Sequence, residues 1–243
     1  LAYLLARAAD TIADTRIIPP DGRQEHLQIF QKQVAGPTRV SSLRVLEQGL
    51  TGQQAIPDER VLLSSLPEVF SMLEDLPELD VHRVRTVLQN LILGMEFDLA
   101  SFPSEDSGEI GTIENAAILD GYTYQVAGCV GQFWTEISIA HVSGLRNWDH
   151  QRMSALGMRF GKALQMTNVL RDFPKDLRIG RCYLPLDQLA RFGVMPHDLL
   201  DAQTGSKARP VLVQGIETAL GHYAAAEEYI LSVSYTHLTL PTS

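Results

Sequence analysis

The chain has 243 residues, of which 45% are hydrophobic and 20% are charged, a balance typical of globular proteins. Its formal net charge of −9, with no basic tract to offset it, argues against a nucleic-acid partner. Two cysteines are too few for a disulfide framework, and no apolar run reaches the about 18 residues expected of a membrane span. We therefore expect a cytoplasmic location.

Apolar residues recur at helical spacing along most of the chain, and no segment before residue 234 alternates as a strand does. Helices are predicted over residues 1–17, 22–35, 38–49, 57–74, 79–101, 112–143, 150–179, 186–192 and 207–232. Residues 113–141 and 153–170 are apolar on nearly all sides, so we expect both stretches at the centre of the fold. The pattern predicts a single all-α domain over residues 1–233.

Both ends of the chain have features of their own. The first residue is not Met, and the chain opens inside a helix-like stretch, so we expect a truncated N-terminus. The C-terminal helices also look cut short. Residues 234–243 replace the helical pattern with a Thr-rich, β-prone string, which we interpret as a non-native tail.

Two aspartate pairs share the spacing Asp-x-x-x-Asp. Asp10 and Asp14 form the first pair, and Asp172 and Asp176 form the second. Residues four apart lie on one face of a helix, so each pair presents two carboxylates side by side. Such carboxylates repel one another unless a cation lies between them, and their hard oxygen atoms suit Mg²⁺.

The second pair belongs to a longer polar stripe on an otherwise apolar helix. Gln165 and Asn168 precede it at helical spacing, and the four side chains fall within an arc of about 80°. The nearby basic residues are Arg7 at the first pair and Arg171, Lys175, Arg178 and Arg181 at the second. Carboxylates, a divalent metal and arginines together indicate a site that binds a diphosphate and stabilises its departure.

Pro174 lies between the two aspartates of the second pair. It lacks the N–H that would bond to Leu170, so we expect a kink there or an early end to the helix.

Three segments together resemble the squalene/phytoene synthase family of head-to-head prenyl diphosphate synthases. Residues 6–14 resemble the first aspartate-rich motif of the family. Residues 122–131, Tyr-Thr-Tyr-Gln-Val-Ala-Gly-Cys-Val-Gly, match a signature in which the tyrosine is followed by Val-Ala-Gly. Residues 161–176 and 180–185 match the second aspartate-rich motif and its Arg-x-Tyr-x-Pro trailer.

The resemblance implies an isoprenoid-synthase-type helical bundle with a central cavity, across which the aspartate pairs face each other. It implies Mg²⁺, prenyl diphosphate substrates, and NADPH if the product is reduced. The metal ligands would be Asp10, Asp14, Asn168, Asp172 and Asp176. The diphosphate contacts would be Arg7, Gln165, Arg171, Arg181 and Tyr183. Tyr122 would lie near the reacting carbons, where it handles a proton or stabilises a carbocation.

The signature segment can also be analysed as a helix. Tyr122, Val126, Cys129 and Phe133 share one face. Small residues at positions 127, 128 and 131 either permit close approach of another helix or leave room for a substrate chain. We include Val126 and Gly128 among the substrate-binding candidates, and we expect Cys129 to be an inert buried thiol.

The implied reaction condenses two farnesyl diphosphates through a cyclopropyl diphosphate to squalene or dehydrosqualene. A phytoene synthase acting on two geranylgeranyl diphosphates is the alternative. Phe133 and Trp134 favour the shorter substrate if either ring faces the cavity.

Other classes fit less well. The intact aspartate pairs argue against a non-catalytic subunit that keeps the fold. A di-iron bundle is disfavoured because none of the seven histidines has Glu three residues before it. Peripheral membrane contact is expected because substrate and product are apolar, and the sequence predicts no oligomeric state.

Overall fold

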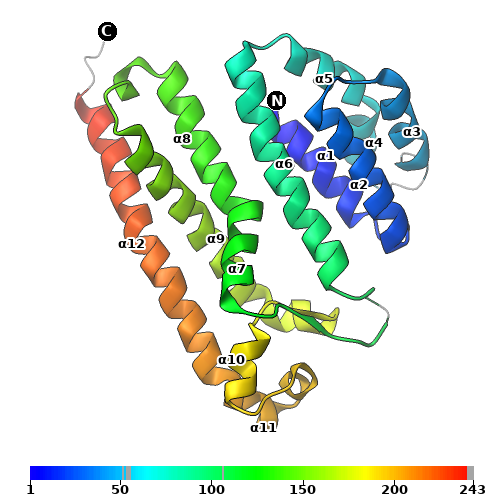
Figure 1. Ribbon diagram of the computed structural model, residues 1–243, viewed down its shortest axis with the longest axis vertical. Coiled ribbons are helices and arrows are strands. Elements are labelled where there is room, and N and C mark those ends of the chain that lie inside the picture. Colours follow the sequence, from blue (N-terminus) through cyan, green and yellow to red (C-terminus); the bar gives the residue numbers. More distant parts are fainter. Residues whose placement is uncertain (51, 53–55, 106, 240–243) are drawn as a thin grey trace. The chain divides into compact units, whose positions relative to one another are not determined.

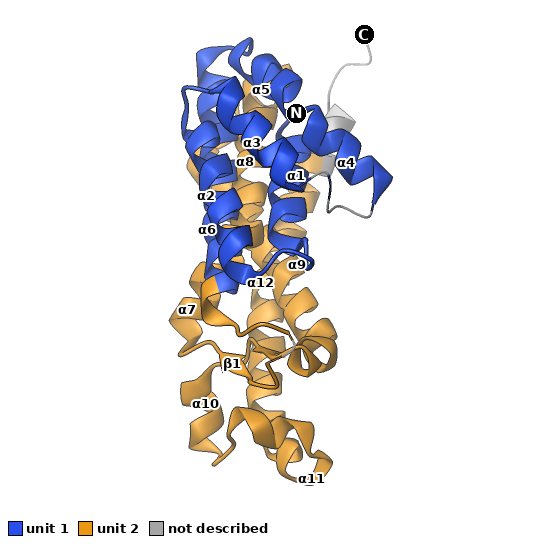
Figure 2. Cartoon of the chain, turned by 90° about the vertical axis from the view of Figure 1, so that its right-hand side faces the viewer, with its two compact units in different colours: residues 1–99 blue, residues 100–243 orange. Residues whose placement is uncertain are grey.

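The computed structural model describes residues 1–50, 52, 56–105 and 107–239, with side chains described as far as residue 233. The chain divides into two compact units, residues 1–99 and 100–243, which Figure 2 shows in separate colours. The prediction of a single domain over residues 1–233 stays a prediction. Every segment predicted as helical contains a helix, so the all-α prediction is confirmed.

The first unit is built from α1 (Ala2–Asp14), α2 (Pro20–Ala35), α3 (Val40–Leu50), α4 (Pro57–Ser64), α5 (Leu66–Glu74) and most of α6 (Glu78–Ser101). The amphipathic pattern of α1 explains its orientation, because Leu5, Ala9 and Ile12 are buried. On α2, Phe30 packs edge to face on Phe70 of α5, with ring centroids 5.7 Å apart. This core leaves the polar side of α1 free to carry functional groups.

The predicted helix over residues 57–74 is wrong as a single element, because α4 ends at Ser64 and α5 begins at Leu66. The interruption precedes Pro67, which lies in the first turn of α5. Within a continuous helix, Pro67 would lack the N–H that bonds to Leu63 and its ring would crowd that carbonyl. In the first turn of a new helix the missing N–H has no cost.

The second unit contains a run of helices and one pair of very short strands. In chain order these are β1 (Gly111–Thr112), α7 (Ala116–Thr123), the π-helical turn η1 (Tyr124–Gly128), α8 (Cys129–His141), the 3₁₀ turn η2 (Ser143–Leu145), α9 (His150–Arg178), β2 (Arg181–Cys182), α10 (Leu186–Arg191), the 3₁₀ turn η3 (Pro196–Leu200), α11 (Ala202–Gly205), the 3₁₀ turn η4 (Ser206–Ala208) and α12 (Arg209–Thr239). The long helix α9 packs against both α8 and α12 (Figure 1).

The prediction of one helix over residues 112–143 is wrong in two respects. Its start is not helical, because β1 pairs in parallel with β2 and Asn115 caps α7 by accepting hydrogen bonds from the backbone N–H groups of Ala117 and Ile118. Its middle contains the π-helical turn η1 within the Val-Ala-Gly signature. A π-turn inserts one extra residue, so side chains before and after it no longer follow a single 3.6-residue repeat.

Small residues bring the backbones of α8 and α9 unusually close. A Cβ added at Gly131 would lie 2.6 Å from the carbonyl carbon of Gly157, and one added at Gly157 would lie 2.7 Å from the Gly131 oxygen. One added at Gly161 would lie 2.7 Å from the Ala127 carbonyl carbon. Of the two interpretations of the small residues, close helix approach is therefore the one observed at these positions.

Pro174 does not end its helix, since α9 continues to Arg178. The proline itself lacks one backbone N–H donor, and Val169 and Leu177 on either side of it are buried. The β-prone interpretation of the C-terminal residues is also wrong as far as Thr239, because α12 continues through them. Their origin as a non-native tail stays a prediction. Within the described residues, no helix is long and apolar enough to cross a membrane.

Candidate active site

The first aspartate pair lies on the polar side of α1. Asp10 is half-buried, Asp14 is exposed, and Arg7 forms a salt bridge with Asp10 one turn earlier. Burial raises the pKa of Asp10 above its ordinary value, and the neighbouring carboxylate of Asp14 raises it further. The two carboxylates therefore repel each other as the spacing predicts, and a cation between them would relieve that repulsion.

A third carboxylate, which the sequence analysis missed, joins this group from α4. Glu59 forms a salt bridge with Arg7, and its side chain is only 12% exposed. Its charge also contributes to the raised pKa of Asp10. Arg7, predicted to contact diphosphate, is thus held between Asp10 and Glu59. Glu59 is distant in sequence and follows an ordinary helix start, so no local pattern could have identified it.

The second aspartate pair lies on α9, together with the predicted amides. The side chains of Gln165, Asn168, Asp172 and Asp176 are all half-buried. The Asn168 amide donates to Gln165 Oε1 at 3.4 Å, which places these two side chains side by side. Gln165 and Asn168 thus adjoin as the spacing predicts, and Asp172 and Asp176 follow at successive turns of the same helix.

The two aspartates of α9 have different electrostatic surroundings. Arg171 Nε and Nη2 donate to the two oxygens of Asp172 at 2.9 and 2.7 Å, and this hydrogen bonding lowers the Asp172 pKa. Burial raises the pKa of Asp176, and the charge of Asp172 adds to the rise. Arg181 and Lys175 oppose that rise from nearby. Arg171 and Arg181 therefore lie close to the carboxylates, as predicted for groups that would also contact diphosphate.

Tyr122 belongs to a buried aromatic cluster with Phe102 and Tyr183. The rings of Tyr122 and Tyr183 are stacked with centroids 5.1 Å apart, and the Tyr122 hydroxyl donates to Tyr183 Oη at 3.4 Å. Phe102 packs edge to face on Tyr183 at 4.8 Å. The structure thus brings the tyrosine of the signature against the tyrosine of the Arg-x-Tyr-x-Pro trailer. Phe102 was missed because it follows α6 without any motif.

The remaining candidates of the signature have mixed surroundings. Val126 is half-buried in η1. Gly128 is buried, and a Cβ there would meet Lys162 and Met158 of α9 at 3.2 and 3.3 Å. Gly128 therefore serves helix packing, and a substrate contact at this position stays a prediction. Burial raises the pKa of Cys129 to about 12, which agrees with an inert thiol.

Trp134 is 64% exposed on α8, and the neighbouring Phe133 is half-buried. The aspartate faces that would border the substrate cavity belong to different units, so the idea that either ring shortens that cavity stays a prediction. A helical wheel drawn from Tyr122 to Phe133 loses its register across the π-turn η1.

The donor atoms of both aspartate faces fit Mg²⁺, which binds through one or two carboxylates and leaves positions for phosphate oxygens. Among the residues that the structure describes, no cluster of three or more His, Cys, Asp or Glu side chains forms a complete metal site. Asp10 with Asp14, and Asp172 with Asp176 and Asn168, would each supply part of a coordination shell. The two faces belong to different units, so their meeting across a cavity stays a prediction.

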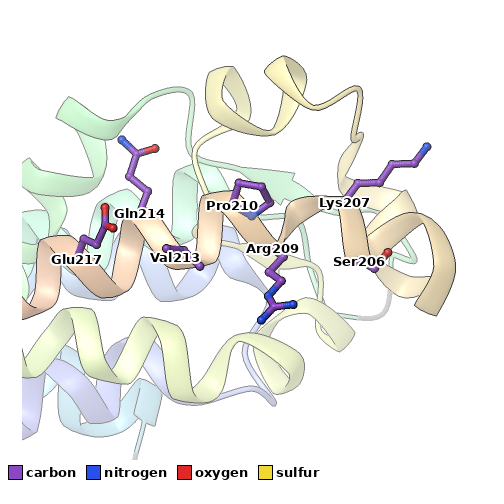
Figure 3. Close-up of a pocket in the computed structure, with 7 residues that line it drawn as sticks. All are labelled: Ser206, Lys207, Arg209, Pro210, Val213, Gln214 and Glu217. Carbon is purple, nitrogen blue, oxygen red and sulfur yellow. The ribbon is translucent and has the colours of Figure 1, made fainter.

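A separate groove of about 700 Å³ lies at the start of α12. Figure 3 shows its lining residues, among them Lys207, Arg209 and Glu217. None of the predicted site residues lines this groove, so it is not part of the candidate active site.

The family model for squalene/phytoene synthases matches residues 1–240. The chain therefore belongs to the squalene/phytoene synthase family. This assignment agrees with the two aspartate faces and with the Tyr122–Tyr183 pair described above, which lie on the three segments that carry the resemblance.

Several curated proteins are similar to this chain. The presqualene diphosphate synthase of Zymomonas mobilis is 34% identical over 154 residues, which cover 62% of this chain and 46% of that protein. The squalene synthase of Yarrowia lipolytica is 25% identical over 236 residues, covering 96% and 49%. A bifunctional lycopene cyclase/phytoene synthase of Colletotrichum graminicola is 26% identical over 235 residues, covering 94% and 36%. The chain thus spans about half, or less, of these relatives.

Solved structures show the same fold. A complex of TcSQS with the ligand BPH1237 matches with a TM-score of 0.67 and 24% identity, covering 94% of this chain and 61% of the other. A dehydrosqualene synthase in complex with a ligand matches with a TM-score of 0.55 and 21% identity, covering 94% and 65%. The predicted isoprenoid-synthase-type fold is therefore confirmed.

Proposed function

We propose that this chain is a prenyltransferase that condenses two farnesyl diphosphates head to head. The reaction would pass through a cyclopropyl diphosphate to squalene or dehydrosqualene. The observation that carries the proposal is the oxygen-lined face of α9, where Asn168, Asp172 and Asp176 lie beside Arg171 and Arg181. Its family membership supports the same class of reaction.

The residues of the two aspartate faces would hold the diphosphates. Asp10, Asp14, Asn168, Asp172 and Asp176 supply oxygen ligands for Mg²⁺, which neutralises charge on the leaving group when bound. Arg171 and Arg181 offer N–H donors for phosphate oxygens. In this structure Arg171 pairs with Asp172 and Arg181 lies near Glu105. When a diphosphate binds, each arginine would exchange its carboxylate partner for a phosphate oxygen.

The aromatic cluster would serve the hydrocarbon part of the reaction. Loss of diphosphate leaves an allylic cation, which an apolar site protects from water. The faces of Tyr122, Tyr183 and Phe102 could stabilise such a cation through their π electrons. Of these, Tyr122 carries a buried hydroxyl that meets a second hydroxyl at 3.4 Å, a pair able to pass a proton to a departing diphosphate.

Phytoene synthesis from two geranylgeranyl diphosphates is the second candidate. Relatives with that activity in their names match over most of this chain. Phe133 and Trp134 favour farnesyl diphosphate if either ring faces the cavity. A non-catalytic subunit is the third reading, against which the intact aspartate faces argue.

Product analysis by mass spectrometry tests the proposal. The chain would receive farnesyl and geranylgeranyl diphosphates in competition, with Mg²⁺ or EDTA and with or without NADPH. A thirty-carbon product that requires Mg²⁺ supports the proposal, and its dependence on NADPH separates squalene from dehydrosqualene. A forty-carbon product establishes the phytoene alternative. No product, together with no Mg²⁺-dependent binding of a non-hydrolysable diphosphate analogue, favours the non-catalytic subunit.

Asp172→Asn provides the residue-level test. We expect at least a hundredfold loss of turnover, as is typical when a group that stabilises developing charge is removed. Asp187→Asn is the matched control, because Asp187 is likewise a carboxylate paired with an arginine, Arg191, at 3.6 Å. Equal activities of the two variants would refute the role of Asp172.

A further inference from the structure

A buried lysine lies within the apolar centre of the second unit. The side chain of Lys162, in the middle of α9, is only 9% exposed, and its Nζ donates to Asp120 Oδ1 on α7 at 2.7 Å. The Asp120 side chain is 58% exposed. A buried ammonium is costly unless it is paired, so this ion pair fixes where α7 can lie relative to α9.

The alkyl stem of Lys162 makes a second contact, with the π-helical turn. The Cγ of Lys162 lies 3.2 Å from the position that a Cβ on Gly128 would take. Lys162 therefore touches η1 through its stem and α7 through its ammonium. Tyr122 lies between these two points, two residues after Asp120 and just before η1 begins at Tyr124.

We propose that Lys162 and Asp120 are positioning residues for Tyr122, a role that rests on the proposed function. A π-turn inserts one extra residue into a helix, so the helical register of α8 does not by itself set the rotation of α7. The Lys162–Asp120 pair sets that rotation instead. Lys162 also precedes Gln165 on α9 by less than one turn, so a single helix sets the positions of the diphosphate-binding face and of the tyrosine.

Loss of Asp120 and loss of the Lys162 charge should have different consequences, because the two groups differ in burial and in neighbouring charges. Arg159 Nε donates to His222 Nδ1 at 3.4 Å. Burial depresses the pKa of His222, Arg159 and Lys162 depress it further, and Asp120 raises it. Asp120 is thus the anion that offsets the nearby cations Arg159 and Lys162. Its loss leaves the buried ammonium of Lys162 uncompensated, whereas loss of the Lys162 charge leaves a carboxylate that water can solvate.

The test compares Lys162→Met, Asp120→Asn, Asp120→Glu and the double variant K162M/D120N. Methionine keeps most of the stem of Lys162 and removes its charge. The control is Arg152→Met, which removes a salt bridge to Glu228 on α12 from the same helix α9. We expect K162M to lower kcat about tenfold and D120N to lower it at least as much, both with little change in KM, because small misplacements of a reacting group have effects of this size or larger.

Three further results are expected from the same set. Asp120→Glu should restore most of kcat, because an exposed carboxylate one methylene longer can still reach the ammonium. The double variant should lose no more activity than D120N alone, since the two residues act as one pair. R152M should stay within about twofold of the wild type, as an exposed salt bridge contributes little.

An independent readout separates this inference from the proposed function. In the ¹³C-tyrosine NMR spectrum, with Tyr122 assigned through Tyr122→Phe, its ring signal should shift in K162M and D120N and stay in place in R152M. If the wild type forms no product, the proposed function fails, and the ring signal alone decides the positioning role. Unchanged kcat together with an unchanged Tyr122 signal in K162M and D120N would overturn the inference.

Discussion

The close contact between α8 and α9 makes a sharp prediction for Gly131→Ala. The new Cβ would lie 2.6 Å from the carbonyl carbon of Gly157 and even nearer to its oxygen, whereas real Cβ contacts essentially never fall under 3.0 Å. The carbon atom alone demands a displacement of about 0.4 Å, and the oxygen demands more. Since the neighbouring atoms are backbone, no side chain can rotate away.

The expected cost follows from overpacking a well-packed interior. Substitutions of this kind typically destabilise by about 1–3 kcal/mol, and a clash between two backbones belongs at the upper end. For a chain of this size, about 3 kcal/mol corresponds to a fall in Tm of about 6–12 °C. Gly221→Ala on α12 is the matched control, because nothing lies within 4 Å of its added Cβ. It should gain about 0.5–1 kcal/mol from helix propensity.

Thermal and urea unfolding, followed by circular dichroism, measure both variants against the wild type. Gly131→Ala should also lower turnover, since spreading α8 from α9 moves Tyr122 relative to Asn168 and Asp172. A Gly131→Ala protein that melts within about 2 °C of the wild type would refute the inferred backbone contact. A similar loss in Gly221→Ala would show that glycine, and not the contact, determines stability in these helices.

Three other predictions concern single groups. Burial lowers the pKa of His222, and Arg159 and Lys162 lower it further. The neutral imidazole therefore contributes stability that is present above the unfolded pKa of about 6.5 and is lost as the pH falls through the folded pKa. The Tm should fall less between about pH 7 and about pH 5 in H222Q than in the wild type. Burial raises the thiol pKa values of Cys129 to about 12 and Cys182 to about 11, so neither should react with DTNB in the native protein at about pH 8, and both should react in urea. Rapid labelling of the native protein would contradict this. Asn115→Ala should cost about 1 kcal/mol in urea unfolding through loss of the α7 cap, whereas Asn147→Ala, at an exposed loop residue, should cost much less.

The sequence predicted those parts of the site that lie along one helix. The stripe of Gln165, Asn168, Asp172 and Asp176 follows from 3.6-residue geometry alone, and α9 carries all four as expected. Glu59 could not be found in this way, because it joins Arg7 across 52 positions of the chain. Such contacts depend on how helices pack, and single-helix periodicity contains no information on that packing.

Helix boundaries also depend partly on local sequence and partly on how helices pack. The break before Pro67 could have been predicted from its missing N–H, yet Pro174 breaks nothing in a longer helix with buried residues on both sides. The missing N–H of a proline destabilises a helix interior at either position, and tertiary packing decides whether the helix continues through the proline. The strands β1 and β2 have only two residues each, too short for an alternating pattern to be detected.

One overlooked signal was nevertheless present in the sequence. Lys162 is one of only two cations, with Arg159, within residues 153–170, a stretch expected at the centre of the fold. Lysines are almost never fully buried unless they are paired, so its position already required a carboxylate from a neighbouring helix. Asp120, next to the signature, supplies it. The glycine contacts then explain why that neighbour is so close, because backbones that touch at Gly131 and Gly157 let a lysine stem reach the next element. The small residues and the buried charge are therefore two parts of one arrangement, and substitution of either should disturb Tyr122.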